Sequence, residues 1–174
     1  TLVTKSNAQR HGMVMWDEIF EEISQDYRDI TTDKMLVDAM TTRMVLDPQS
    51  IDTVVASNLH ADILTDLAAS LSGSMGIAPT GNLDPEKRHP SMFEPIHGSA
   101  FDIMGQGIAN PIGSYWSAVM MLENLGELKA SQRLMSAIEK LTSDKKILPK
   151  DLGGKSSTKE VTKAMINILL GKNK

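Results

Sequence analysis

The first half of the chain alternates short apolar runs with apolar positions at helical spacing. The run Leu2–Thr4 predicts a strand, and apolar residues from Trp16 to Tyr27 recur with the spacing of an amphipathic helix. Residues 29–35 predict a second strand and residues 36–44 a second helix. This order of elements is typical of an α/β protein.

The next segment combines a buried strand, a helix and a long loop. Val54 and Val55 predict a buried strand that leads directly into a helix with Asn58 as its N-cap and Gly73 near its end. Residues 76–107 are rich in glycine and proline, so we expect loop and short strand there. A loop region of this length within a compact protein is usually functional.

Three further helices are expected in the rest of the chain. Asn110-Pro111 places an N-cap before proline at the first helical position, and this helix ends at Gly126. A second helix spans about 128–141. Ser157-x-x-Glu160 has the pattern of a capping box that opens the last helix. The apolar face of that helix comprises Val161, Ala164, Met165, Ile168 and Leu169.

Composition narrows the class of protein. The 174 residues are 41% apolar and 23% charged, which is typical of a globular chain of one-domain length. Eighteen Lys and Arg against 22 Asp and Glu leave a net charge of −4. Nucleic-acid-binding proteins typically have an excess of basic residues, which this chain lacks. We therefore expect no nucleic-acid partner.

The absence of cysteine and of long apolar runs excludes further classes. With no cysteine, the chain can hold no disulfide, zinc–thiolate site or thiol nucleophile, and a catalytic metal must take oxygen or nitrogen ligands. No apolar run approaches the ~20 residues of a membrane span, so we expect no membrane partner. No signal peptide is recognisable, and we expect a cytoplasmic protein.

Asp62 and Asp66 are the strongest candidates for metal ligands. They are four positions apart in an expected helix, so both carboxylates project from one face and repel each other unless a cation lies between them. Mg²⁺ and Mn²⁺ prefer such ligands. The alternative is an ordinary solvated helix face. The helix follows a buried strand, and ligands in α/β proteins bind beyond the carboxyl ends of strands.

Two other charged residues are ambiguous by themselves. Asp38 is a single acid in an apolar run, where a helix-surface or capping acid is the simpler interpretation. Lys5 ends the first strand, and such a lysine is generally solvated, although one that lies near a metal can carry a proton.

The string Glu94-Pro95-Ile96-His97-Gly98-Ser99-Ala100-Phe101-Asp102 is unusual. Its small residues let backbone N–H groups approach a ligand, His97 could contact a base, and Asp102 could accept hydrogen bonds from ribose hydroxyls. A structural loop is the alternative. The chain contains no GxGxxG fingerprint, no P-loop and no G-x-S-x-G elbow around Ser99.

Four strings, taken together and in this order, resemble the β-decarboxylating dehydrogenases, which include the isopropylmalate, isocitrate, tartrate and D-malate dehydrogenases. The strings are VTKSNA, LVDAM, ASNLHADILTDLAA and FEPIHGSAFDIMGQGIANPIGSYWSAVMMLENLG. The resemblance covers essentially the whole chain. Residues 76–98 resemble the tartrate and D-malate branch rather than isopropylmalate dehydrogenase.

The resemblance implies roles for five residues. Lys5 is similar to the base that takes the proton of the substrate's 2-hydroxyl, and Asn7 to a contact with substrate or nicotinamide. Asp62 and Asp66 would hold Mg²⁺ or Mn²⁺ together with Asp38, which the other subunit of a homodimer contributes in this family.

The resemblance also implies NAD as cofactor. His97, Gly98, Ser99 and Ala100 would line the adenosine pocket, and Asn110 would bond the adenine. Asp102 followed by Ile103 is similar to the NAD-using members, because a carboxylate there accepts from the ribose 2′-hydroxyl and repels a 2′-phosphate. The implied reaction is oxidation of a malate-type 2-hydroxyacid followed by loss of CO₂.

Two departures from the family pattern bear on the expected site and fold. Phe101 replaces the usual proline after Gly-Ser-Ala, and we expect this to alter the pocket wall. Members are also about twice as long, and the portion with no counterpart here carries the substrate-binding arginines. We therefore expect the C-terminal portion of the isopropylmalate dehydrogenase-like fold, with residues 1–72 in the substrate and dimerisation domain and residues 73–174 in the NAD-binding domain.

By itself this chain should turn over poorly or not at all, because it lacks those arginines. Two alternatives stay open: an isopropylmalate dehydrogenase, and a catalytically inactive fragment that dimerises and binds nucleotide.

Overall fold

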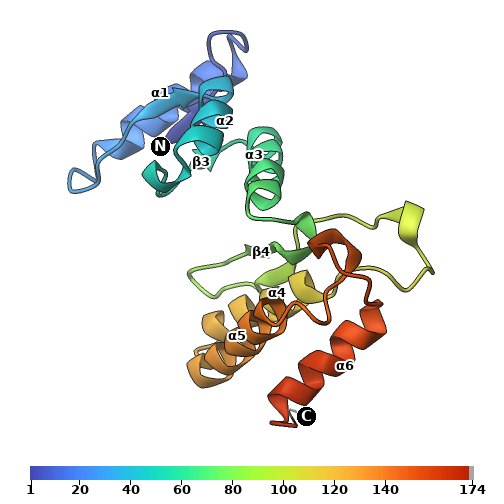
Figure 1. Cartoon of the computed structure of the whole chain (residues 1–174). Helices are drawn as coiled ribbons and strands as arrows, with labels where there is room; N and C mark the ends of the chain where they lie inside the picture. The colour runs from blue at the N-terminus through green and yellow to red at the C-terminus, as the bar shows by residue number, and fades with distance from the viewer. Residues whose placement is uncertain (173–174) are drawn as a thin grey trace. The chain divides into compact units, whose positions relative to one another are not determined.

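The computed structural model describes residues 1–172 and divides the chain into two compact units, Thr1–Leu71 and Ser72–Lys174 (Figure 1). Each unit has its own cluster of buried apolar side chains. The mixture of helices and small sheets confirms the α/β class.

A small parallel sheet organises the first unit. Its strands are β1 (Leu2–Thr4), β2 (Lys34–Leu36) and β3 (Val55–Ala56), in the order β2-β1-β3. The central strand β1 is wholly buried and pairs Leu2 with both Lys34 and Val55. Since all three strands run in one direction, their carboxyl ends lie at the same edge of the sheet.

Three helices accompany this sheet: α1 (Gly12–Ser24), α2 (Val37–Leu46) and α3 (Asn58–Leu71), with a 3₁₀ turn at Pro48–Ser50. Val3, Met40 and Leu64 form the buried cluster, one residue each from β1, α2 and α3. Several apolar residues of α1 are not part of this buried cluster: Met15, Ile19 and Ile23 are 46–53% exposed.

The structure corrects three local predictions in this unit. Tyr27 lies beyond the end of α1, and Val55 is 40% exposed because β3 is an edge strand. Asn58 is the first helical residue rather than the cap, and the hydroxyl of Ser57 accepts a hydrogen bond from the His60 N–H.

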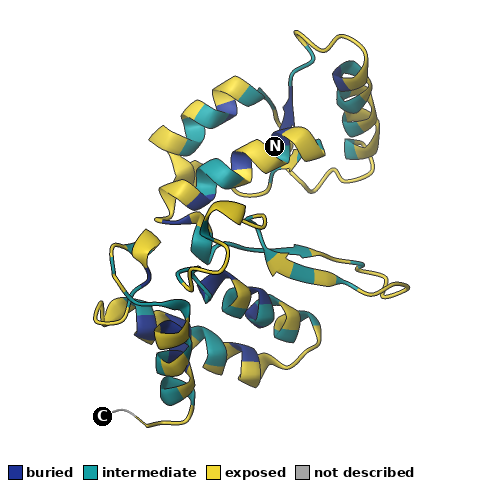
Figure 2. Cartoon of the chain, turned by 90° about the vertical axis from the view of Figure 1, so that its right-hand side faces the viewer, coloured by how far each residue is buried: buried dark blue, intermediate teal, exposed yellow. Residues whose placement is uncertain are grey.

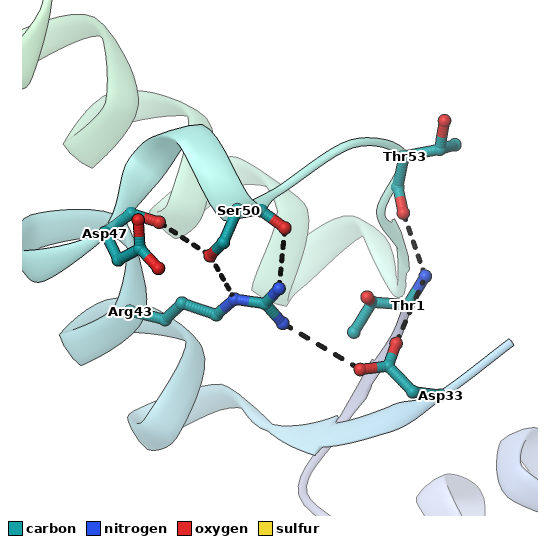
Figure 3. A network of polar contacts seen from close by, with 6 residues as sticks. All are labelled: Thr1, Asp33, Arg43, Asp47, Ser50 and Thr53. Atoms are coloured by element: carbon teal, nitrogen blue, oxygen red, sulfur yellow. Dashed lines mark hydrogen bonds and ion pairs between the residues drawn. The ribbon is translucent and has the colours of Figure 1, made fainter. Parts of the chain in front are cut away.

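Arg43 on α2 ties together segments far apart in the sequence (Figure 3). Its guanidinium donates to Oγ and the carbonyl of Ser50, at 2.8 and 2.6 Å, and pairs with Asp33 at 3.8 Å. The Thr1 amino nitrogen lies 3.7 Å from the other oxygen of Asp33 and donates to the carbonyl of Thr53. The contacts join α2 to the segments before β2 and β3.

The second unit combines a hairpin with three helices. β4 (Pro79–Asn82) and β5 (Met92–Pro95) are antiparallel, and α4 (Ile112–Asn124), α5 (Leu128–Ser143) and α6 (Thr158–Leu169) follow. α4 packs against both the hairpin and α5, and α6 packs against α5. Buried positions lie on one side of these helices (Figure 2). They comprise Ile112, Val119, Ala137, Ile138, Leu141, Val161 and Met165.

Gly113 explains how α4 approaches the hairpin so closely. A Cβ at this position would lie 3.0 Å from the carbonyl oxygen of Gly76 and 3.3 Å from the Pro95 side chain. These distances are tighter than ordinary van der Waals contact, so a larger residue would push α4 away from β5.

Helix capping in this unit follows the sequence with one adjustment. Pro111 occupies the cap position of α4, yet the side chain of Asn110 performs the capping, since its Oδ1 accepts from the Ile112 N–H at 2.9 Å. The capping box of α6 is confirmed: Ser157 Oγ accepts from the Glu160 N–H, and the Glu160 carboxylate accepts from the Ser157 N–H. Within residues 1–172, no helix is long and apolar enough to cross a membrane.

The capping box yields a stability prediction. Ser157→Ala removes the acceptor for the Glu160 N–H and should lower the free energy of unfolding by about 1 kcal/mol. The neighbouring Ser156→Ala is the matched control and should change it by less than about 0.5 kcal/mol. Urea unfolding of the chain measures both, and equal losses would contradict the assigned cap.

Candidate active site

Lys5 and Asp38 form an ion pair at the carboxyl edge of the parallel sheet. Lys5 directly follows β1, and Asp38 lies in the first turn of α2, two residues after β2. The Lys5 Nζ donates to Asp38 Oδ1 at 2.6 Å, although the two residues are 33 positions apart. The structure therefore joins two residues that appeared isolated in the sequence.

The pair favours the charged form of Asp38. The hydrogen bond from Lys5 is the main cause that lowers the pKa of this carboxyl, and the backbone N–H groups of Asp38 and Ala39 lower it further. These N–H groups belong to the first turn of α2, where an acidic side chain is favoured by the helix dipole.

A tight turn carries Lys5 and Asn7. The N–H groups of Ala8 and Gln9 both donate to the carbonyl of Lys5, at 2.9 and 2.8 Å. Asn7 is exposed at the outside of this turn, and its side chain has no hydrogen-bond partner within residues 1–172. The turn thus presents an amine and a free carboxamide two positions apart at the sheet edge.

Asp17 on α1 is a polar contact of this turn that sequence reasoning missed. Its Oδ2 accepts from Ser6 Oγ at 2.7 Å and from Lys34 Nζ at 3.0 Å, and its side chain is 14% exposed. The sequence did contain a signal, since Asp17 lies four positions after the buried Met13 and three before Phe20, on the inner side of an amphipathic helix.

The pKa of Asp17 results from opposing effects. Burial raises it, but the hydrogen bonds from Ser6 and Lys34, together with the nearby Thr4 hydroxyl, outweigh burial, so the pKa lies below its ordinary value of 3.8. The Thr4 hydroxyl is fully buried near this carboxylate, without the geometry of a full hydrogen bond to it. Oδ1 of Asp17 is also buried, and all the strong donors converge on Oδ2.

This lowered pKa predicts how stability depends on pH. The stabilisation from ionised Asp17 is fully present above pH 3.8 and is lost as the pH falls through the lower pKa of the folded state. We expect the loss of unfolding free energy in Asp17→Asn to be largest near neutral pH and to shrink below about pH 4. Urea unfolding across this range measures it, with Glu22→Gln on the same helix as an exposed-acid control. A loss independent of pH would contradict the assignment.

Asp62 and Asp66 lie on α3, which follows β3 at the same edge of the sheet. Asp62 is exposed and Asp66 is half-buried, whereas Leu64 between them points into the core. Neither carboxylate has an ion-pair partner among the described residues. No group of three or more metal-ligating side chains occurs within residues 1–172, so Asp38 does not join this pair within one chain.

Asp62 and Asp66 can supply some, but not all, of the ligands that a divalent cation needs. Their carboxylates have no cation partner, they share one helix, and hard oxygen donors suit Mg²⁺ or Mn²⁺. Two carboxylates are too few for a complete coordination shell, so further ligands must come from substrate, water or another chain.

The loop expected to hold adenosine follows β5 in the second unit. His97 is half-buried with its Nδ1 3.1 Å from the Gly98 carbonyl oxygen, and Gly98, Ser99 and Ala100 are exposed. Ala100 has φ of 44°, a left-handed conformation that costs energy in a residue other than glycine. Such strain at an exposed loop is typical of a functional segment.

A short 3₁₀ helix, Phe101–Ile103, continues this loop. Asp102 is exposed, and its carboxylate has no ion-pair partner in the described part of the chain. Phe101 is 78% exposed, so the residue that departs from the family pattern points largely to solvent. The segment offers a free carboxylate beside the strained backbone, which suits recognition of neighbouring hydroxyl groups.

The end of the loop is anchored by two residues that sequence reasoning missed. Thr158 donates from its N–H to the Gly107 carbonyl and from its hydroxyl to the Ala109 carbonyl. Asp151 accepts from Asn110 Nδ2 at 2.8 Å and also from the Ser74 hydroxyl. Because the Asn110 side chain both caps α4 and bonds Asp151, it ties the loop to the turn before α6.

Comparison with known proteins identifies the family. The sequence profile described as isocitrate/isopropylmalate dehydrogenase matches residues 1–166. The chain belongs to this family. This confirms the resemblance to the β-decarboxylating dehydrogenases and the corresponding fold.

Similar proteins favour one branch of the family. A probable tartrate dehydrogenase/decarboxylase of Agrobacterium vitis is 64% identical over 99% of this chain and 48% of its own length. The decarboxylating D-malate dehydrogenase of Escherichia coli K12 is 42% identical over 98% and 48%. The isocitrate dehydrogenase structure from Methylococcus capsulatus superposes with a TM-score of 0.89 at 36% identity, over 97% and 49%. The chain thus spans about half the length of the relatives that it matches.

Proposed function

We propose that this chain forms part of an enzyme that oxidises and decarboxylates a malate-type 2-hydroxyacid, such as tartrate or D-malate, with NAD and a divalent cation. The observation that carries the proposal is the Lys5–Asp38 pair, which lies at the sheet edge where β3 leads to Asp62 and Asp66. Membership of the family and the names of the similar proteins support this substrate class.

The ion pair bears on how a dimeric site would be assembled. In the proposal, Asp38 joins Asp62 and Asp66 of a second subunit, in agreement with the absence of a three-acid group within the described residues of one chain. Because Lys5 is bonded to Asp38, the lysine would enter the same site from the same subunit. Val45, Leu46 and Leu67 supply apolar surface on α2 and α3 for such a dimer.

Several residues of this chain would have separate roles in the reaction. When bound, the divalent cation supplies polarisation of the 2-oxygen and NAD⁺ supplies the hydride acceptor. Lys5, once its amine is neutral, would take the proton from the 2-hydroxyl, either directly or through water, and Asp38 would hold the amine in place by accepting a hydrogen bond from it. Asn7 would orient substrate or nicotinamide from the outside of the same turn.

The loop after β5 would bind the nucleotide. His97, Gly98, Ser99 and Ala100 would surround the adenosine, and the segment at Asn110 would contact the adenine. The free carboxylate of Asp102, with Ile103 beside it, would accept from the ribose 2′-hydroxyl and repel a 2′-phosphate. NAD is therefore the proposed cofactor rather than NADP.

An activity assay tests the proposal. NADH formation is followed with D-malate or tartrate and Mn²⁺, for the chain alone and for the chain joined to the N-terminal half of the Agrobacterium vitis relative. We expect little turnover by the chain alone and clear turnover by the fusion, preferring NAD⁺ to NADP⁺. Lys5→Met should reduce kcat of the fusion at least about 100-fold. A folded fusion that is inactive, or one that is active without Lys5, would contradict the proposal.

Metal binding gives a separate prediction. Asp62→Asn and Asp66→Asn should each weaken Mn²⁺ binding to the chain, measured by calorimetry, about tenfold or more because each removes a charged ligand. Asp52→Asn, an exposed acid elsewhere in the first unit, is the matched control and should leave binding unchanged. Equal binding by all three variants would place the metal elsewhere.

A further inference from the structure

We propose that Asp17 is a positioning residue that holds the Lys5–Asp38 pair in its working arrangement. The proposal rests on the proposed function for what the pair does, and on contacts within the first unit for how the pair is held. Asp17 forms no bond to either residue within residues 1–172, so any influence on the pair is indirect.

The first contact fixes the turn that carries Lys5. Ser6 follows Lys5 directly, and its hydroxyl donates to Asp17 Oδ2 at 2.7 Å. The carbonyl of Lys5 already accepts from Ala8 and Gln9, so the turn itself is closed. Anchoring Ser6 to α1 therefore sets the direction in which this closed turn leaves β1, and with it the place of the lysine amine.

The second contact fixes the strand that leads to Asp38. Lys34 begins β2, where it pairs with Leu2, and its Nζ donates to the same Oδ2 of Asp17 at 3.0 Å. Asp38 lies four positions further along, just after the strand becomes α2. One carboxylate oxygen of Asp17 thus accepts hydrogen bonds from both segments that carry the ion pair.

Burial distinguishes this cluster from an ordinary surface ion pair. The Asp17 side chain is 14% exposed and lies beside the fully buried Thr4, whereas the Lys34 side chain is 56% exposed. A carboxylate buried this far is costly unless donors satisfy it, and losing either donor leaves it poorly satisfied. The cluster is therefore sensitive to the placement of Ser6 and Lys34, which makes it suited to holding their neighbours.

A zero-length cross-link measures the arrangement without any need for activity. A carbodiimide can join Lys5 Nζ to Asp38 only while they remain in contact, and peptide mass spectrometry of the full chain gives the yield. We expect Asp17→Asn to lower this yield about tenfold, in line with residues that orient a site through its ligands. Ser6→Ala should lower it in the same direction by a smaller factor. Glu22→Gln, an exposed acid on the same helix, should leave it unchanged.

The kinetics of the fusion described above give a second measurement, which would not change if Asp17 had only a structural role. Asp17→Asn should lower kcat about 10- to 100-fold while the KM for NAD⁺ stays unchanged. If the parent fusion does not oxidise the hydroxyacids, the proposed function fails, yet the cross-link still decides the role of Asp17. A folded Asp17→Asn chain with the parent cross-link yield would overturn the proposal. If that variant does not fold, an unchanged yield in Ser6→Ala would overturn it.

Discussion

The pairing of β1 with two parallel neighbours is the constraint on which the first unit depends. Because β1 runs parallel to both β2 and β3, the residues that follow all three strands emerge at one edge of the sheet. That edge carries Lys5, Asp38 and the helix of the two aspartates. An order with β3 between β1 and β2 would separate Lys5 from Asp38 although no residue had changed.

Polar contacts then fix more closely the segments that carry candidate site residues. Asp17 bonds Ser6 and Lys34 beside the ion pair, and Arg43 joins α2 to the segments before β2 and β3. In the second unit, Asp151 anchors Asn110 at the end of the loop that follows β5. In both units a carboxylate on a neighbouring element holds a segment that carries candidate site residues. Such contacts orient chemically active groups without touching a ligand.

The sequence predicted much of the local structure for identifiable reasons. The capping box at Ser157 and the apolar face of α6 depend on residues three and four positions apart, which the pattern displays directly. Predictions were weaker where burial depends on distant neighbours. Val55 looks like a core residue from its side chain alone, yet an edge strand leaves it exposed. Asp17 was missed because its partners are 11 and 17 positions away.

The sequence by itself therefore determined the α/β class, the family and the candidate residues, since periodicity, capping and motif strings are properties of neighbouring positions. Only the tertiary structure decided that Lys5 and Asp38 form one ion pair, that Asp17 bonds a neighbour of each, and that Asp38 stands apart from Asp62 and Asp66 within the described chain. The physical reason is that these relations depend on strand order and helix packing, which unite residues far apart along the chain.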